Sequence, residues 1–278
     1  MSDFVQFCRT HGVLIDSLPP IGRWVRVKTE DKPRHRNGAV KWMGDFGFCQ
    51  NWATMEEPAY WREEVSTQAR ARAATARRSA DKQAELLARQ AAEKAHTILS
   101  ECELTTHPYF ERKGFPEQIV NVWKDDIAVI PMRRGRDLVG LQMIDIEGGK
   151  KFLFGQRSGG AEFILGQKGM HVLCEGFATA LSAQAVLRNL KIPYSIHVTF
   201  SAGNMKRIAQ GLPGGVVLAD NDASGTGERV AQEIGWPYWM SDVVGEDFND
   251  AHQRLGMFPL AMRLKGVMRR SGEVAEPS

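Results

Sequence analysis

The chain has 278 residues, of which 43% are hydrophobic and 25% charged, and its formal net charge is +3. These proportions are those of an ordinary globular protein with enough apolar residues for a sizeable core, and the length suits two domains. A net charge this small does not establish a nucleic-acid partner, so that inference depends on local clusters of basic residues.

Cysteine usage and hydropathy exclude two further classes of protein. The four cysteines are widely scattered and none forms a Cys-x-x-Cys pair, which favours a reducing compartment over a disulfide scaffold. No uninterrupted apolar stretch reaches the length of a membrane span, and the N-terminus lacks the basic region of a signal peptide. We therefore expect a soluble, cytoplasmic protein without a membrane partner.

Residues 1–56 are expected to form a small β-rich module. Residues 22–27 alternate polar and apolar side chains, as a half-buried strand does, and further short strands are expected at 39–42 and 47–52. The module mixes basic with aromatic residues: Arg23, Arg26, Lys28, Lys32, Arg34, Arg36 and Lys41 lie among Trp24, Trp42, Phe46, Phe48 and Trp52. Two interpretations stay open. The mixture binds single-stranded nucleic acid by phosphate contacts and base stacking, or the aromatic residues form a core inside a solvated basic rim.

The same module contains four possible zinc ligands, Cys8, His11, His35 and Cys49. Their spacing is irregular, and Cys8 lies on the apolar face of an expected short helix. Structural zinc sites use tighter ligand pairs at both ends, so we do not expect zinc here.

Residues 57–100 are expected to form a long helical linker. After Tyr60 the run contains neither Gly nor Pro and is rich in strong helix formers. A helix of about 40 residues would be about 60 Å long. Its apolar residues are mostly Ala, without a sustained heptad seam, which favours a solvated connecting helix over a coiled coil.

Residues 101–168 are expected to form a small basic α+β half of the next domain. A short helix is predicted at 107–114, and strands of an antiparallel sheet are predicted at 127–131, 139–146 and 151–154.

Basic side chains precede a Gly-rich turn at the end of this half. Lys150, Lys151 and Arg157 come just before Ser158-Gly159-Gly160. This pattern is typical of a site for nucleotide phosphates, because basic side chains and a close-approaching backbone both favour an anion. An exposed basic hairpin is the alternative.

In residues 169–256 strands alternate with helices. The apolar runs at 171–174 and 216–219 are typical of buried strands. The alternation predicts a parallel sheet with right-handed crossovers, in which ligands bind at the C-terminal ends of the strands. Glu175 follows the first run and Asp220 the second, so both are expected at that edge of the sheet.

Asp220 and Asp222 are one residue apart in front of a Gly-rich turn. If the strand continues to Asp222, the two carboxylates point to the same side and repel each other unless a cation lies between them. An oxygen-only ligand set with open positions suits Mg²⁺ or Mn²⁺. The alternative is a solvated turn that caps the following helix. Glu175 at a neighbouring strand end favours the metal site.

These motifs resemble the TOPRIM domain shared by bacterial-type primases, type IA and II topoisomerases and some nucleases. The resemblance is to phage and plasmid DnaG-like primases over residues 95–255, and the N-terminal module resembles the front of the same proteins less specifically. The matching motifs are Glu175-Gly176, Asp220-x-Asp222, Asp247-x-x-Asp250, His107-Pro108-Tyr109 to Gly114, Ile130-Pro131, Lys151 to Gly160, and Ser201-Ala202-Gly203-Asn204.

The resemblance implies an α/β fold in which a TOPRIM domain follows a small basic α+β subdomain, with the β-rich module joined by the long helix. It implies a DNA primase that makes short RNA primers on single-stranded DNA for phage or plasmid replication, in a bacterial cytoplasm beside a separate helicase. Glu175, Asp220 and Asp222 would be catalytic, and with Asp247 and Asp250 would hold Mg²⁺ or Mn²⁺. The implied contacts to ribonucleoside triphosphates or template are Arg133, Arg134, Lys150, Lys151, Arg157 and Asn204.

The chain departs from this family in two places. The N-terminal zinc ribbon that helps such primases select a template is absent, and Thr179 stands where the family often has a further acid. No ATPase P-loop occurs, so a fused helicase is not expected. The alternatives are a TOPRIM-type metal-dependent nuclease and a non-catalytic replication accessory that binds single-stranded DNA. Residues 257–278 are expected to form a helix at 260–268 and a disordered tail.

Overall fold

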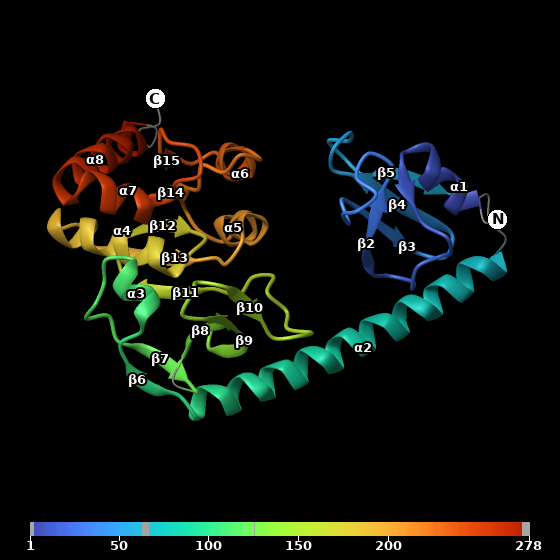
Figure 1. Cartoon of the computed structure of the whole chain (residues 1–278), viewed down its shortest axis with the longest axis horizontal. Coiled ribbons are helices and arrows are strands. Elements are labelled where there is room, and N and C mark those ends of the chain that lie inside the picture. The colour runs from blue at the N-terminus through green and yellow to red at the C-terminus, as the bar shows by residue number, and fades with distance from the viewer. Residues whose placement is uncertain (1–2, 63–66, 125, 274–278) are drawn as a thin grey trace. The chain divides into compact units, whose positions relative to one another are not determined.

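The computed structural model describes residues 3–62, 67–124 and 126–273 of the chain (Figure 1). It is a mixed α/β protein with three five-stranded sheets in the described residues. The chain divides into two compact units, an N-terminal unit (Met1–Leu86) and a C-terminal unit (Leu87–Ser278). Within the ranges given above, none of the helices combines the length and the apolar character needed to cross a bilayer.

The N-terminal unit is an antiparallel sheet covered on one face by a short amphipathic helix, α1 (Asp3–Thr10). The sheet order follows the chain: β1 (Val13–Leu14), β2 (Trp24–Thr29), β3 (Gly38–Trp42), β4 (Phe46–Asn51) and β5 (Ala59–Arg62). Phe4 and Cys8 of α1 pack on Val40, Trp42 and Cys49 of the sheet, and all five are buried. The three strands predicted for this module are therefore confirmed as β2, β3 and β4.

Strand β5 corrects the expectation that the helical linker begins at residue 57. Tyr60 and Trp61 pair with β4 at the edge of the sheet, and Trp61 lies 5.6 Å from Trp42, ring centre to ring centre. Aromatic side chains favour a pleated, half-buried surface, and Trp61 gains a partner in the core by staying on the sheet. The helix starts only at Thr67.

Helix α2 (Thr67–Ser100) contributes to both units, and its second half corrects the expectation of a solvated connecting helix. In the C-terminal unit Ala91, Ala95 and Ile98 are buried against Val129 and Leu141. These small side chains let the helix approach the sheet closely, although they give little sign of an apolar stripe in the sequence.

The basic half of the C-terminal unit is an antiparallel sheet with the order β10-β9-β8-β7-β6. Its strands are β6 (Glu103–Thr105), β7 (Val120–Trp123), β8 (Ile127–Arg134), β9 (Asp137–Ile144) and β10 (Lys150–Phe152). The predicted strands at 127–131, 139–146 and 151–154 correspond to β8, β9 and β10. A short helix, α3 (Pro108–Arg112), precedes β7 and buries Tyr109 and Phe110.

The third sheet has the order β11-β13-β12-β14-β15, and the predicted parallel arrangement is confirmed for all of its strands except β11. The strands are β11 (Phe163–Gly166), β12 (Met170–Cys174), β13 (Tyr194–Val198), β14 (Val216–Ala219) and β15 (Tyr238–Met240). Every residue of β14 is buried, as expected for a strand covered on both faces.

Helices cover both faces of this sheet (Figure 1). Helices α4 (Phe177–Asn189), α7 (Phe248–Leu255) and α8 (Met257–Glu273) lie on one face, and α5 (Ala202–Ala209) and α6 (Thr226–Ile234) lie on the other. Val216 and Leu218 of β14 enter the core on the α4 side, whereas Val217 and Ala219 enter the core on the α5 side. The first of these cores continues into the basic half, so the two sheets are packed as one body.

The last helix is longer than the sequence predicts. A helix at 260–268 is expected, followed by a disordered tail, but α8 runs from Met257 to Glu273. Leu260, Leu264 and Val267 are buried at helical spacing on the large core, which stabilises the helix through its apolar face. Residues 274–278 of the expected tail lie outside the described residues.

Removing the Phe110 ring is expected to destabilise the C-terminal unit. The ring is fully buried and meets Phe177 of α4 edge to face, with centroids 5.4 Å apart. A Phe110→Ala change should lower the free energy of unfolding by about 3–5 kcal/mol, measured by urea denaturation. Leu104→Ala is the control, because Leu104 is 73% exposed and its loss should change stability by less than about 0.5 kcal/mol.

Candidate active site

Two acidic residues lie side by side at the C-terminal edge of the parallel sheet. Glu175 directly follows β12, and Asp220 directly follows β14. The two strands are parallel neighbours, with Val172 opposite Val216 and Leu173 opposite Val217. Because parallel strands in register end at the same edge, the predicted proximity of Glu175 and Asp220 follows from the sheet itself.

Asp220 carries the strongest signal of a missing ligand. Its Oδ1 atom is buried and has no hydrogen-bond partner among the described residues. Burial raises the pKa of the carboxyl to about 7, the negative charges of Glu175 and Asp247 add to the rise, and Lys150 opposes it. A buried carboxylate oxygen with no donor and with like charges around it is satisfied by a cation.

Glu175 is held at the start of α5. Its carboxylate accepts a hydrogen bond from the backbone N–H of Ala202, and its backbone carbonyl accepts one from Phe200 N–H at 3.0 Å. Burial raises the pKa of Glu175, and the charge of Asp222 adds to the rise, while Ala202 and Lys150 lower it. Glu175 is thus a fixed, half-buried acid beside Asp220.

Asp222 has a different environment from the one predicted. The strand ends at Ala219, so the alternation of a strand does not extend to Asp222. Instead the Asp222 carboxylate accepts hydrogen bonds from the backbone N–H and the hydroxyl of Ser224, which lower its pKa. Asp222 therefore lies in the turn that precedes a helix, whereas Asp220 directly follows the strand and stays beside Glu175.

A glycine allows α6 to approach the backbone of Asp220. A Cβ atom on Gly227 would collide with the main chain of Asp220. Gly225, with φ +65°, starts the helix in the left-handed region that favours glycine. The Gly-rich turn after Asp222 thus positions the acidic loop against α6.

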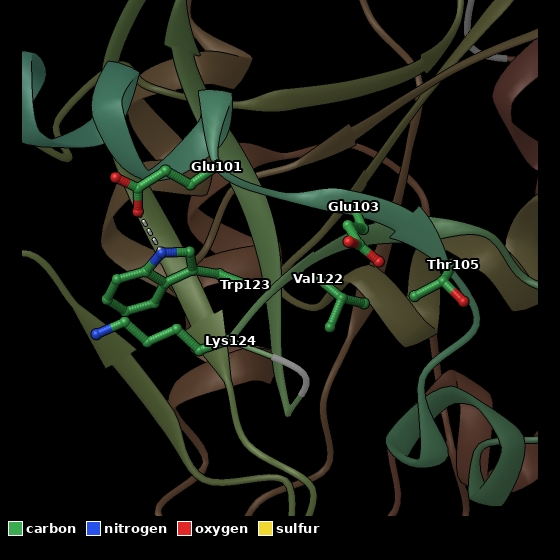
Figure 2. Close-up of a pocket in the computed structure, with 6 residues that line it drawn as sticks. All are labelled: Glu101, Glu103, Thr105, Val122, Trp123 and Lys124. Carbon is green, nitrogen blue, oxygen red and sulfur yellow. Dashed lines mark hydrogen bonds between the residues drawn. The ribbon is translucent and has the colours of Figure 1, made fainter.

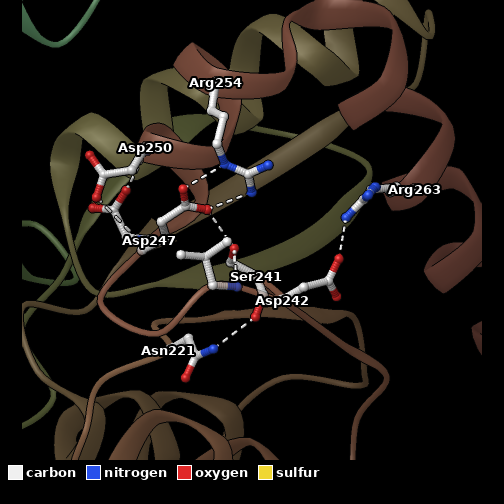
Figure 3. A network of polar contacts seen from close by, with 9 residues as sticks. Asn221, Ser241, Asp242, Asp247, Asp250, Arg254 and Arg263 are labelled. Atoms are coloured by element: carbon white, nitrogen blue, oxygen red, sulfur yellow. Dashed lines mark hydrogen bonds and ion pairs between the residues drawn. The ribbon is translucent and has the colours of Figure 1, made fainter.

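Asp247 and Asp250 form the capping box of α7 (Figure 3). The Asp247 carboxylate accepts from Asp250 N–H at 2.8 Å, and the Asp250 carboxylate accepts from Asp247 N–H at 3.3 Å. Asp250 also pairs with Lys113 at 2.8 Å. Of the two, Asp247 raises the pKa of Asp220, so Asp247 lies near the site. Asp250 is held by Lys113 at the C-terminal end of α3.

A polar network fixes the loop that carries Asp247 (Figure 3). Asn221 donates to the backbone carbonyl of Ser241 at 2.9 Å, and Ser241 donates to Glu246 at 2.6 Å. Arg254 forms two hydrogen bonds to Glu246, at 2.6 and 2.7 Å, and holds the pKa of Glu246 at about 2. These contacts join the loop after β14 to the loop before α7.

The residues at this edge fit a magnesium or manganese ion in the kind of donor they offer. Asp220, Glu175 and Asp247 supply only carboxylate oxygens, which these ions prefer. In the described parts of the chain, no three Asp, Glu, His or Cys side chains gather closely enough to form a complete metal site. A cation at this edge would bind the unpartnered Oδ1 of Asp220.

The basic residues predicted to bind phosphates lie on two elements of the basic half. Lys150 and Lys151 are adjacent and exposed on β10, and only Lys150 acts on the pKa values of Glu175 and Asp220. Neighbouring side chains on a strand point to opposite faces, so Lys151 points away from Lys150. Arg157 is exposed in the loop that follows.

Arg133 and Arg134 end β8 next to the turn at 158–160. Arg134 donates to the backbone carbonyl of Gly159, and Arg133 donates to that of Arg136 at 3.2 Å. Arg207 of α5, which the sequence analysis missed, lies against Gly159 and Gly160 from the other side. Its only sequence signal is its place three residues after the Ser201–Asn204 motif.

Asn204 is hydrogen-bonded to the main chain. Its side chain is buried, its Nδ2 donates to the carbonyls of Ala161 and Thr199 at 2.7 Å each, and its Oδ1 accepts from Gly160 N–H at 2.6 Å. The hydrogen bonds of this amide are all to the main chain, so a contact of Asn204 with phosphate or ribose stays a prediction. Asn204 holds the Gly-rich turn against α5.

A separate pocket of about 340 Å³ lies beside β6 and β7, and none of the carboxylates above lines it (Figure 2). Trp123 donates its indole N–H to Glu101 at 2.9 Å, and Lys124 lies over the Trp123 ring at 4.2 Å. Glu101 and Lys124 thus both contact Trp123, and we assign the pocket no role in the site.

The raised pKa of Asp220 predicts a pH-dependent gain in stability for Asp220→Asn. Its pKa lies near 7 in the folded chain against 3.8 as the ordinary value, so the folded state binds the proton more tightly. The stabilisation that comes from the proton bound to Asp220 is present at pH 4 and is lost as the pH rises through 7. Without divalent ions, Asp220→Asn should therefore gain roughly 4 kcal/mol over the wild type between pH 4 and pH 8, at about 1.36 kcal/mol for each unit of the pKa difference.

The measurement is thermal unfolding at several pH values, with Asp242→Asn as control because Asp242 is 77% exposed on the neighbouring loop. Added Mg²⁺ should raise the melting temperature of the wild type at pH 8 and not that of Asp220→Asn. If the melting temperatures of the wild type and Asp220→Asn differ by the same amount from pH 4 to pH 8, the raised pKa of Asp220 is contradicted.

Asn204→Ala is expected to loosen the turn at 158–161. It removes three hydrogen bonds from a buried side chain and leaves backbone groups unsatisfied, which should cost about 1–3 kcal/mol. Hydrogen exchange should speed up at Gly160 N–H. Asn189→Ala, at an exposed position, serves as control, and equal exchange in both variants would argue against the positioning role.

Comparison with known proteins gives distant structural similarities, two of which follow. No protein-family model matches the chain, and no curated protein sequence matches it. One similar structure is the bacteriophage T7 lagging-strand DNA polymerase interacting with primase domains of two gp4 subunits bound to an RNA/DNA hybrid and dTTP. The sequence identity is 14% and the TM-score is 0.40, and the match covers 60% of this chain and 91% of that one. The other is the primase fragment of the bacteriophage T7 primase-helicase protein, with 15% identity, a TM-score of 0.40, and 58% and 74% coverage.

Proposed function

We propose that the C-terminal unit is the core of a DNA primase with a TOPRIM-type domain, which makes short RNA primers on single-stranded DNA. The observation that carries the proposal is the buried Asp220 Oδ1, which lacks a partner in the described structure beside Glu175 and Asp247. The motif resemblance to phage and plasmid primases supplies the reaction class. The site supplies the acidic centre that such a reaction needs.

In this proposal Asp220, with Glu175 and Asp247, holds Mg²⁺ or Mn²⁺. The bound ion would lower the pKa of the attacking 3′-hydroxyl and neutralise charge on the triphosphate during in-line displacement. Glu175 either completes the ligand set or accepts the proton of the hydroxyl. Its fixed position at the start of α5 keeps its carboxylate beside Asp220 in both roles.

Asp222 and Asp250 support this centre in our proposal through their present contacts. Asp222 adds negative charge beside Glu175 while it pairs with Ser224. Asp250 caps α7 and pairs with Lys113, which fixes the backbone of Asp247. Both hydrogen bonds from Ser224 fall on one oxygen of Asp222, Oδ1. Both oxygens of Asp250 have partners, so Asp250 becomes a metal ligand only after it leaves one of them.

The basic residues provide a place for the triphosphate and the template next to the acids. Lys150 acts electrostatically on both Glu175 and Asp220, so it is near enough to meet a phosphate held at the same ion. Arg134 and Arg207 flank the turn at 158–160, where Gly159 and Gly160 let a phosphate approach the backbone. In our proposal Arg133 and Arg157 extend this basic surface toward the template, whereas Lys151 lies on the opposite face of β10 and would meet the template only there.

The test is synthesis of oligoribonucleotides on single-stranded DNA with the four ribonucleoside triphosphates and Mg²⁺ or Mn²⁺, with and without a replicative helicase from the bacterial host. We expect product from the wild type and a loss of 100-fold or more in Glu175→Gln, since a positioned acid or base contributes about 10²–10⁴-fold. Asp242→Asn should retain activity.

Other outcomes separate the alternatives. Metal-dependent cutting of the template, without NTP incorporation, would identify a nuclease that uses the same acids to activate water. DNA binding that neither Mg²⁺ nor Asp220→Asn affects, with no product on any template, would identify a non-catalytic accessory and would overturn the primase proposal.

A further inference from the structure

The outward face of the N-terminal sheet carries an uninterrupted row of side chains across four strands. Trp24 of β2 lies opposite Lys41 of β3, Lys41 lies opposite Phe48 of β4, and Phe48 lies opposite Tyr60 of β5. We call these four residues the aromatic row. Because opposite residues in an antiparallel sheet share a face, the row forms one continuous surface.

Strand alternation separates this row from the core. Trp42 and Trp61 lie in the adjacent row along β3 and β5, on the opposite face, and pack on Phe4 with ring centroids 5.0 and 5.7 Å away. By contrast, Trp24 is 50% exposed and Tyr60 is 51% exposed. The aromatic residues of this unit therefore divide between a core set and a solvent-facing set.

The rings of the row form a platform of touching aromatic surfaces. Trp24 and Phe48 have centroids 6.2 Å apart, and Phe48 and Tyr60 have centroids 5.4 Å apart. Phe46, at the end of the same face, lies 5.7 Å from both Phe48 and Tyr60 and is covered by the guanidinium of Arg77 at 4.6 Å. Large half-exposed rings that touch one another are costly in water unless a partner uses them.

The charged residues on the strands of the platform are all basic. Strands β2 to β5 contain no Asp or Glu, while Arg26, Lys28, Lys41 and Arg62 all fall at outward-facing positions. Arg26 also stacks on Trp52, with its guanidinium 4.0 Å from the ring centre. Flat rings suit the faces of unpaired bases, and the lysines and arginines beside them suit phosphates.

We infer that the aromatic row is a binding surface for single-stranded nucleic acid, on which bases stack while Arg26, Lys28, Lys41 and Arg62 contact the backbone. Stacking uses the face that every base has, so the surface tolerates different sequences. It requires unpaired bases, so it discriminates against duplex. This site is separate from the acidic centre, and the inference does not depend on primase activity.

The test measures binding of a fluorescent 20-nucleotide oligothymidylate to the full chain by anisotropy, in EDTA and without nucleotides. Trp24→Ala and Tyr60→Ala should each raise Kd about tenfold, whereas Trp24→Phe and Tyr60→Phe should stay within about threefold of wild type because a ring remains. Lys41→Gln should reduce the slope of log K against log salt by about 0.7. An oligouridylate of the same length tests whether RNA or DNA is preferred, and duplex DNA should compete poorly.

Controls keep the result interpretable. Phe258→Ala removes a ring that is 73% exposed on α8 and should leave Kd unchanged, and Asp242→Asn should bind as the wild type does. Photo-crosslinking of the wild type with a 5-iodouracil oligonucleotide should label Trp24, Phe48 or Tyr60, and it does not depend on how the variants fold. Labelling confined to the C-terminal unit, or unchanged affinity in a folded Trp24→Ala, Tyr60→Ala double variant, would overturn the inference.

Discussion

The parallel pairing of β12 with β14 is the contact on which the candidate site depends. It ends two buried strands at one edge and leaves Glu175 and Asp220 side by side, where each raises the energy of the other's charge. Separation would relieve this repulsion, but the strands are covered by helices on both faces and cannot move apart without exposing apolar residues. The fold therefore keeps two acids in a place where only a cation or a proton satisfies them.

The surrounding hydrogen bonds make this arrangement rigid. Asn221 and Glu246 tie the loop after β14 to the loop before α7, and Asn204 ties the Gly-rich turn to α5. These side chains have partners, and so does Asp222, whereas Asp220 Oδ1 has none in the described residues. Preorganised polar groups around one unsatisfied acceptor are the arrangement expected where charge must be stabilised without rearrangement.

Much of this site could be predicted from local patterns, because it depends on where apolar runs stop. The runs before Glu175 and Asp220 indicate buried strands, and strands of a parallel sheet end at one edge. The sequence could not show that β14 stops before Asp220, which puts Asp222 in a turn with Ser224. The positions of Arg207 and of the buried Asn204 amide depend on how α5 packs on a turn that is distant in the sequence. Strand β5 forms because Trp61 packs against Phe4 and Trp42. Such tertiary contacts override local preference.

The two units place opposite charges on their functional surfaces, which separates their dependence on cations. The acidic centre needs a cation to offset the repulsion among Asp220, Glu175 and Asp247. The aromatic row has no acid on its strands, and cations in solution compete with its Lys and Arg for phosphate. Under these two proposals, divalent ions favour ligand binding at the acidic centre and weaken it at the aromatic row. A single strand held by stacking on the row loses less to salt than one held by charge alone, because the contact of a ring with a base involves no ion.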